Sequence, residues 1–379
     1  MRRLLAALLF VLETALSQGV ANAQMLQAIV NSKAVAAGPY VGIVDLVANP
    51  TAIFSLRAAS AAIATTGTQS IVDLRRTSDN ATCTATIAAS GGALDLTVKT
   101  PCGGQSVTAW ATRGTFSGTI AGTSLATSGD ACTAIAGDAI TGAGITSYTT
   151  IASVTSCAVG VGHYVLSQPW TISVAETMTD MIAIAVSQWY DQSARVGCDG
   201  VPCDLVQATA GSQPFLILSG CITASGSCVY STGAQSLVSA DAYTPDTSLS
   251  LGGVAERIST TGACIFGGAP NVNKIVGVSA SANLWTLAGA TNSLNFTASD
   301  AAAHAVNAVI DGASTVVNVD GTETTGTTTL STNTNNPRYG GVAAKTCLVA
   351  EFYFYNAVDF SSGNRSALQA NQKAWFGTP

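Results

Sequence analysis

The stretch Trp189-Tyr190-Asp191-Gln192-Ser193 constrains the fold of this chain more than any other segment. It follows an apolar run, residues 182–186, in which β-branched side chains alternate with alanine. That period of two predicts a strand buried on both faces. A turn region rich in Gly, Pro and Cys, residues 198–203, comes next. The strand therefore ends at a polar corner, where Asp191 is expected either to cap backbone amides or to act as a catalytic carboxylate.

The composition excludes several classes of protein. Charged residues make up 9% of the chain and hydrophobic residues 47%, so the composition is not that of a disordered protein. Glycine-rich turns between short β-branched segments predict an all-β fold. A net charge of −6 without a basic run argues against nucleic acid or an anionic membrane as a partner.

The first 23 residues have the pattern of a secretory signal peptide. Met1-Arg2-Arg3 is basic, residues 4–12 are apolar, and Ala21-Asn22-Ala23 supplies small residues before Gln24. The apolar run is too short to span a membrane, and no later stretch is long and apolar enough. The protein is therefore expected to be exported without a membrane span, and to be secreted, periplasmic or held at the cell surface.

Ten cysteines, all beyond residue 23, predict five disulfides in an exported chain. Zinc is disfavoured as their ligand because no Cys-x-x-Cys pair occurs and only two histidines are present. The connectivity is not fixed by the sequence. The pairs considered are Cys198–Cys203 and Cys221–Cys228, each short enough to close one turn, then Cys132–Cys157, Cys83–Cys102 and, on separate predicted strands, Cys264–Cys347.

The second half of the chain predicts closely spaced strands. Asp320-Gly321 is a hairpin turn signal, and aromatic residues alternate along a last strand at 349–356. Ser361 or Ser362 is expected to begin a helix that runs to Trp375, with Gly377 beyond its end. Other strands are predicted near 40–47 and at 71–74, 215–218, 249–258, 264–266, 275–278, 284–287, 305–310 and 315–319.

Several of these segments resemble a known family. Tyr190-Asp191-Gln192-Ser193 after an apolar strand is similar to the catalytic domain of α-L-arabinofuranosidase B and to related concanavalin-A/laminin-G-like domains. Residues 55–60 (SLRAAS), 72–79 (VDLRRTSD) and 91–95 (GGALD) look like the opening of the same family. The resemblance implies a concanavalin-A-like antiparallel β-sandwich, or jelly roll, with a C-terminal surface helix. It also implies action on, or binding to, arabinose-containing polysaccharide.

The path from residues 91–95 (GGALD) to Tyr190-Asp191-Gln192-Ser193 is longer here than in that family. Residues 105–178 have glycine-rich turns between β-branched pieces and predict an inserted small β module. This segment resembles a short module of phage tail and bacterial surface proteins, which implies spacing or adhesion. The expected organisation is a signal peptide (1–23), the first part of the sandwich (24–104), the module (105–178) and the remainder of the sandwich (179–379).

The resemblance also bears on catalysis. A retaining glycosidase needs two carboxyls about 5–5.5 Å apart. The family's nucleophilic glutamate follows a Cys-Cys pair, but Cys264-Ile265-Phe266 has one cysteine, and no acid occurs between Glu256 and Asp300. The family's proton-donating aspartate follows Gly-Gly, whereas Gly340-Gly341 is followed by Val-Ala-Ala. Both of the family's catalytic positions are therefore expected to be empty.

Other side chains are candidates for a site. The candidate catalytic acids are Glu351, Glu256 and Asp191, of which Glu256 can instead meet Arg257 or solvent and Glu351 can be structural. Sugar rings stack on aromatic side chains and form hydrogen bonds with amides. The candidates for these contacts are Trp285, Tyr353, Tyr355, Asn283 and Asn292. Each of them can also be an ordinary core or rim residue.

Charged groups allow two further expectations. Arg75 and Arg76 can pair with Asp191 or Asp95, or lie at the surface. Calcium can bind the carboxylate pairs Asp241/Asp246 and Asp199/Asp204, and no other cofactor or metal is expected.

Three functions remain open from the sequence. The chain can be a glycoside hydrolase of arabinofuranosidase type, a non-catalytic laminin-G-like or lectin-like glycan-binding protein, or a structural and adhesive surface protein. The missing acids make binding physically easier than hydrolysis.

The signal peptide gives the first testable prediction. Cleavage is expected after Ala23, because the small residues at 21 and 23 suit signal peptidase. Mass spectrometry of the exported protein should give Gln24 as the first residue. Retention of residues 2–12 in the exported protein would contradict the expectation of export by this route.

Overall fold

The part of the chain described by the computed structural model comprises 40–66, 69–87, 92–94, 102, 105–145, 149–158, 160–194, 197–198, 200–218, 227–231, 235–257, 264–269, 274–278, 284–290, 292–297, 302–331, 333–340, 347–357 and 360–378. Only the backbone is described for residues 257, 264, 265, 269, 274–278, 284, 285, 297 and 347. The expected signal peptide lies outside these ranges.

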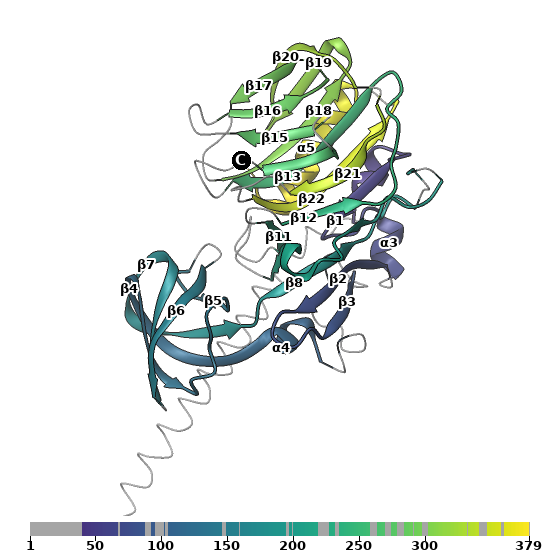
Figure 1. The fold of residues 1–379 in the computed structure, drawn as a ribbon. Helices are drawn as coiled ribbons and strands as arrows, with labels where there is room; N and C mark the ends of the chain where they lie inside the picture. Colours follow the sequence, from purple (N-terminus) through teal and green to yellow (C-terminus); the bar gives the residue numbers. More distant parts are fainter. Residues whose placement is uncertain are drawn as a thin grey trace, which may run out of the picture. The chain divides into compact units, whose positions relative to one another are not determined.

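Strands dominate the fold (Figure 1). The helices are α2 Ile43–Leu46, α3 Ala61–Thr66, α4 Val107–Ala111 and α5 Ser362–Phe376, with a 3-10 turn at Ala210–Ser212. The strands are β1 Ala52–Ser55, β2 Ser70–Arg76, β3 Thr82–Thr86, β4 Thr112–Asp130, β5 Ala139–Gly142, β6 Thr149–Ala158, β7 Gly160–Met181, β8 Ile184–Trp189, β9 Leu205–Val206, β10 Phe215–Ile217, β11 Cys228–Ser231, β12 Ser236–Ser239, β13 Leu249–Arg257, β14 Cys264–Ala269, β15 Lys274–Val278, β16 Leu284–Ala288, β17 Ser293–Thr297, β18 Ala303–Ile310, β19 Gly312–Val319, β20 Thr322–Thr328, β21 Asn336–Gly340 and β22 Cys347–Asn356.

The large sheet consists of two runs of antiparallel strands that meet at β8. One run follows the pairings β8–β10–β11–β22–β13–β18–β19–β20, with β1 beside β22 and β2–β3 beside β8. The other follows β8–β9–β12–β21–β14–β15–β16–β17. The sheet thus folds back on itself, as it must if two apolar faces are to be buried against each other.

Aromatic side chains fill the space between the two runs. The Phe352 ring of β22 lies 5.6 Å from Trp189 of β8 and 5.9 Å from Phe266 of β14, measured between ring centroids. Trp189 is also in edge contact with Tyr339 of β21. All four side chains are buried. The predicted all-β antiparallel sandwich is confirmed, and its core includes the tryptophan of the stretch that follows the apolar run 182–186.

The C-terminal helix forms as the sequence predicts. The Ser361 hydroxyl accepts a hydrogen bond from the Asn364 amide at the N-cap, and Gly377 adopts the left-handed conformation at the other end. Leu368 and Phe376 of α5 pack on the outer face of the β22 run. The helix therefore covers the side of β22 that faces away from the sandwich core.

Two local predictions had different outcomes. The Asp320-Gly321 hairpin is confirmed, because β19 and β20 pair Val319 with Thr322 around these two residues. The strand expected near 40–47 is wrong, since residues 43–46 form helix α2. The Asp45 carboxylate causes the difference, because it accepts hydrogen bonds from the amides of Gly42 and Ala61 and fixes this turn.

A second, four-stranded sheet is made by β4, β5, β6 and β7, all within residues 112–181. Strands β4 and β7 pair from Thr112 to Asp130 through four register shifts. The sheet has a core of its own that includes Phe116, Leu125, Tyr164 and Met178.

Three disulfides are present: Cys83–Cys102, Cys132–Cys157 and Cys198–Cys203, all pairs named from the sequence. Cys228 is disulfide-bonded as well, and Cys221 lies outside the described residues. The side chains of Cys264 and Cys347 also lie outside them, so their pairing stays a prediction.

The second sheet buries three carboxylates, Asp130, Asp138 and Asp180, each no more than 3% exposed. Arg113 pairs with Asp138 at 2.8 Å, whereas its Nε lies 3.7 Å from Asp180. Neither oxygen of Asp180 has a hydrogen-bond partner. Burial raises the pKa of Asp180 to about 7, and the neighbouring charge of Asp138 adds to the rise. Asp180 is therefore best accommodated as a neutral acid.

This arrangement predicts stability that depends on pH. The pKa of Asp180 is higher in the folded protein than its ordinary value of 3.8, so the stabilisation is complete below about pH 4 and is lost as the pH rises through 7. Asp180→Asn mimics the neutral acid. Its stability relative to wild type should therefore be higher at pH 8 than at pH 5, by up to about 3 kcal/mol. Urea unfolding at both pH values measures this difference.

The control for this prediction is Asp138→Asn, which removes the partner of Arg113 and should lower stability at both pH values. A difference between wild type and Asp180→Asn that is the same at pH 5 and pH 8 would contradict the prediction.

Candidate functional site

Asp191 lies at the corner that follows β8 and is 8% exposed. Its carboxylate accepts hydrogen bonds from the amides of Ile53, Ser193 and Cys203 at 2.8–3.1 Å, and from the Ser193 hydroxyl. Burial raises the pKa of Asp191, and the three backbone donors oppose that rise. These contacts are those of a capping residue, which leaves the catalytic alternative for Asp191 without support.

The neighbours of Asp191 complete the corner. The Gln192 side chain donates to the Ser55 carbonyl and accepts from the Ala59 amide, while Tyr190 donates to Asp73. The stretch thereby joins β8 to the segment around β1. Its polar residues hold the chain rather than lining an opening.

The arginines expected to pair with Asp191 do not do so. Arg75 donates to Gln213 and Asn80, and Arg76 pairs with Asp79 at 2.5 Å. The expectation of an Arg75 or Arg76 pair with Asp191 is wrong, because Asp191 is already saturated by local donors. Asp95 lies outside the described residues.

Glu351, on β22, forms the most deeply buried ion pair of the described residues. The Arg57 guanidinium meets it with two bonds, Nε to Oε2 at 2.7 Å and Nη2 to Oε1 at 3.1 Å. Ser55 and Gln372 donate to the same carboxylate. Arg57 is 1% exposed and Glu351 is not exposed at all. Such a two-pronged, hydrogen-bonded pair suits the fixed fork of arginine.

Helix α5 closes over this pair. Arg57 Nη2 donates to Asn371 Oδ1 at 2.7 Å, and the guanidinium carbon lies within 5.4 Å of the Trp375 and Phe376 ring centroids. Burial by itself lowers the pKa of Arg57, but the Glu351 carboxylate together with the Tyr40 and Tyr353 hydroxyls opposes burial, and the pKa is raised. Arg57 thus stays charged, and Glu351 has no access to a substrate. The proposal of Glu351 as a catalytic acid is corrected to a structural role.

Glu256 offers no partner for catalysis with Glu351. It is half-buried on β13 and lies opposite Leu348 of β22, whereas Glu351 lies opposite Val254. Three residues along a strand correspond to about 10 Å. That spacing exceeds the separation of about 5–5.5 Å that retaining chemistry requires.

The proposed sugar-stacking tyrosines are in the core. Tyr353 and Tyr355 have no exposed surface, and Tyr355 donates to the Val47 carbonyl at 2.7 Å while Tyr353 donates to Asn307. Burial raises the pKa of both hydroxyls. Their predicted role in sugar contact is corrected, because α5 and α2 cover the face on which they lie. Asn292 is exposed beyond β16, while Asn283 and the Trp285 side chain lie outside the described residues.

The calcium expectation for Asp241/Asp246 and Asp199/Asp204 stays a prediction. Asp204 accepts from the Asp191 amide and from Gln188, Asp246 is exposed, and Asp199 lies outside the described ranges. Where side chains are described, metal-ligand spacing is found once, at Asp130, Cys132 and Cys157. Those two sulfurs form a disulfide and provide no thiolate.

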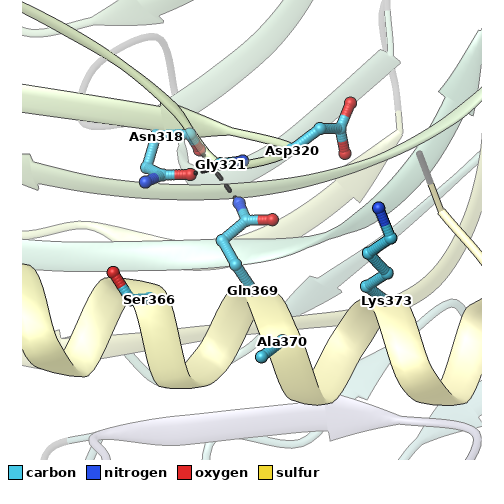
Figure 2. A pocket seen from close by; sticks show the side chains of 7 residues that line it. All are labelled: Asn318, Asp320, Gly321, Ser366, Gln369, Ala370 and Lys373. Carbon is cyan, nitrogen blue, oxygen red and sulfur yellow. Dashed lines mark hydrogen bonds between the residues drawn. The ribbon is translucent and has the colours of Figure 1, made fainter.

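A polar pocket of about 230 Å³ lies between α5 and the β19–β20 turn (Figure 2). Figure 2 shows Gln369 and Lys373 extending from the helix toward that turn. Sequence reasoning missed this pocket, although the lining residues of the helix recur at the spacing of one helical face. The lining residues are Asn318, Asp320, Gly321, Ser366, Gln369, Ala370 and Lys373.

Comparison with known proteins adds to this geometry. No family model and no curated protein matches the chain significantly. A solved arabinofuranosidase in complex with arabinofuranosyl-α-1,2-xylobiose superposes with a TM-score of 0.55 at 12% identity, over 88% of this chain and 65% of the other. A GH54 α-L-arabinofuranosidase soaked with a cyclic sulfate inhibitor gives 0.54 at 11% identity, with the same coverage. The likeness is one of fold.

The chain thus spans about two thirds of the length of those enzymes, 65%. The expected resemblance is supported as a distant structural relationship, and the β-sandwich is the shared feature. No helix in the described ranges is long and apolar enough to cross a membrane.

The structural role of Glu351 predicts the effect of its replacement. Glu351→Gln leaves the Arg57 charge buried without a counter-charge, so the free energy of unfolding should fall by about 3–5 kcal/mol. Urea denaturation measures the loss. Asp246→Asn, at an exposed position, is the matched control and should change stability little.

A double-mutant cycle with Arg57→Met separates the pair from its surroundings. The double variant should lose clearly less stability than the sum of the two single losses. Additive losses would contradict the assigned coupling between Arg57 and Glu351.

Proposed function

We propose that this chain is an exported glycan-binding β-sandwich that does not hydrolyse its ligand by the arabinofuranosidase mechanism. The observation that carries the non-catalytic part of the proposal is the burial of Glu351 and its ion pair with Arg57. Glu351 is bonded at both oxygens by Arg57 and has no exposed surface. A carboxylate in this state can neither attack a sugar carbon nor deliver a proton to a leaving oxygen.

The ligand class proposed is an arabinose-containing polysaccharide. Support comes from the fold shared with the two arabinofuranosidases and from the sequence motifs around 55–60, 72–79 and 190–193. A binding protein needs a polar surface of the right shape, whereas a hydrolase also needs two placed carboxyls. The acids Asp191, Glu256 and Glu351 do not meet the second need, because Asp191 and Glu351 are buried and bonded within the protein and Glu256 lies too far along the strands from Glu351.

Export is part of the proposal. The expected signal peptide supports it, and so do the disulfides, which persist in oxidising compartments. A location outside the cytoplasm would bring the protein into contact with polysaccharide. Spacing or adhesion by residues 105–178 remains the alternative function, and binding to a glycan array distinguishes the two.

Hydrolysis and binding can be tested on the same protein. Activity on a chromogenic aryl α-L-arabinofuranoside should be absent, or at least about 10²–10⁴-fold below that of a true arabinofuranosidase, because acid/base assistance is missing. Affinity electrophoresis in gels that contain arabinan or arabinoxylan should show retardation, and gels without polysaccharide serve as the control.

Robust hydrolysis that Glu256→Gln or Asp191→Asn abolishes, with folding intact, would overturn the non-catalytic part of the proposal. Unretarded migration in every polysaccharide gel would overturn the binding part.

A further inference from the structure

We infer that the pocket between α5 and the β19–β20 turn binds one neutral sugar unit through its hydroxyl groups. The inference rests on the proposed glycan-binding function and gives it a location. It assigns a site at the edge of the helix-covered face, away from the sandwich core.

Asp320 supplies a fixed acceptor on the strand side of the pocket. Its Oδ1 accepts from the Ala305 amide at 3.0 Å, and its Oδ2 is hydrogen-bonded to His304 Nδ1. The residue sits in the left-handed conformation of the turn, with φ of 49°. Each carboxylate oxygen has two acceptor sites, so these two bonds orient Asp320 and leave it able to accept hydroxyl protons.

The helix side supplies polar groups that have no partner in the described part of the protein. Gln369 is 6% exposed, and its Nε2 donates to the carbonyls of Ala305 and Asn318 while its Oε1 accepts no bond. The Ser366 hydroxyl and the Lys373 ammonium likewise form no hydrogen bond or ion pair there. The pocket therefore offers both donors and acceptors whose hydrogen-bonding capacity is not used within the protein.

Charge and chemistry select the class of ligand. Asp320 disfavours an anion and Lys373 disfavours a cation, so an ion of either sign meets one like charge in the pocket. A hydroxyl both donates and accepts, and adjacent hydroxyls on a sugar match this mixture of groups. A neutral polyol can bond to both charged groups together without meeting a like charge.

The size of the pocket limits the ligand to one sugar unit. Its volume of about 230 Å³ lies below the range of about 300–1,000 Å³ usual for larger ligands. Ser366, Ala370 and Lys373 are exposed, so one side of the pocket is open to solvent. That opening allows the rest of a polysaccharide to leave the site, which fits a terminal or branch sugar.

Two alanines of α5 provide a matched test. Ala370 lines the pocket and Ala374 does not, yet both are exposed on the same helix. Ala370→Trp should fill the pocket and weaken sugar binding at least tenfold, whereas Ala374→Trp should leave it unchanged. Asp320→Asn tests the acceptor without changing the backbone, since asparagine tolerates the left-handed region, and it should also weaken binding at least tenfold.

The readout is NMR titration of amide signals from residues 318–321 and 366–373 with methyl α-L-arabinofuranoside and methyl β-D-xylopyranoside. Inorganic phosphate and Ca²⁺ serve as ionic probes. Saturable shifts with either glycoside in wild type, lost in Ala370→Trp and Asp320→Asn and kept in Ala374→Trp, support the site. Saturation by phosphate or Ca²⁺ with no response to a glycoside overturns it.

Affinity electrophoresis of the same variants separates this inference from the proposed function. If wild type and all variants are retarded equally by polysaccharide and the pocket signals do not shift, glycan binding stands and the pocket is not its site. If polysaccharide retards nothing but a glycoside saturates the pocket signals, the sugar site stands and polysaccharide binding fails. If neither occurs, both fail.

Discussion

The buried pair of Arg57 and Glu351 is the interaction on which the rest of this architecture depends. It joins a residue just after β1 to the last strand, 294 positions away, and Gln372 and Asn371 of α5 complete it. A buried charge is costly unless a counter-charge and hydrogen bonds compensate it, and Arg57 has both through Nε and Nη2, although its Nη1 has no hydrogen-bond partner in the described part of the chain. The pair thereby links the first strand, the last strand and the last helix, and its bonds to Asn371 and Gln372 hold the helix on one face of the sheet.

The position of helix α5 determines whether the aromatic side chains of β22 are accessible to a ligand. Residues of β22 alternate between the sandwich core, where Phe352 lies, and the helix, where Tyr353 and Tyr355 lie. Both faces are buried, so no ring of this alternating set is available to a ligand. The polar pocket beside Lys373 lies at the margin of this helix, where Ser366, Ala370 and Lys373 are exposed.

Local signals in the sequence were sufficient for some elements and not for others. The Asp320-Gly321 turn and the Ser361-capped helix depend on residues within a few positions, and both were predicted. Helix α2 was missed because Asp45 acts through the Ala61 amide, which lies beyond the local window. The structural role of Glu351 depends on its ion pair with Arg57. A pairing between residues 294 positions apart produces no periodic pattern in the sequence, so it could not be predicted. The alternation of aromatic residues along β22 likewise predicts that the strand has two distinct faces, but it does not predict which face a helix covers.

The relation between this fold and glycoside chemistry can be stated in terms of strand register. Opposite residues on neighbouring antiparallel strands have Cβ atoms about 4.5–5.5 Å apart, close to the carboxyl separation of about 5–5.5 Å used by retaining enzymes. The sandwich thus provides the spacing wherever two acids face each other. Here Glu351 faces Val254 on β13 and Ser55 on β1. Glu256 faces Leu348 on β22 and Ala303 on β18, so neither acid has a carboxylate opposite it. At 12% identity two chains can share the layers of a fold without sharing such a pair, because core packing constrains the volume of apolar side chains and does not determine the position of a second carboxylate.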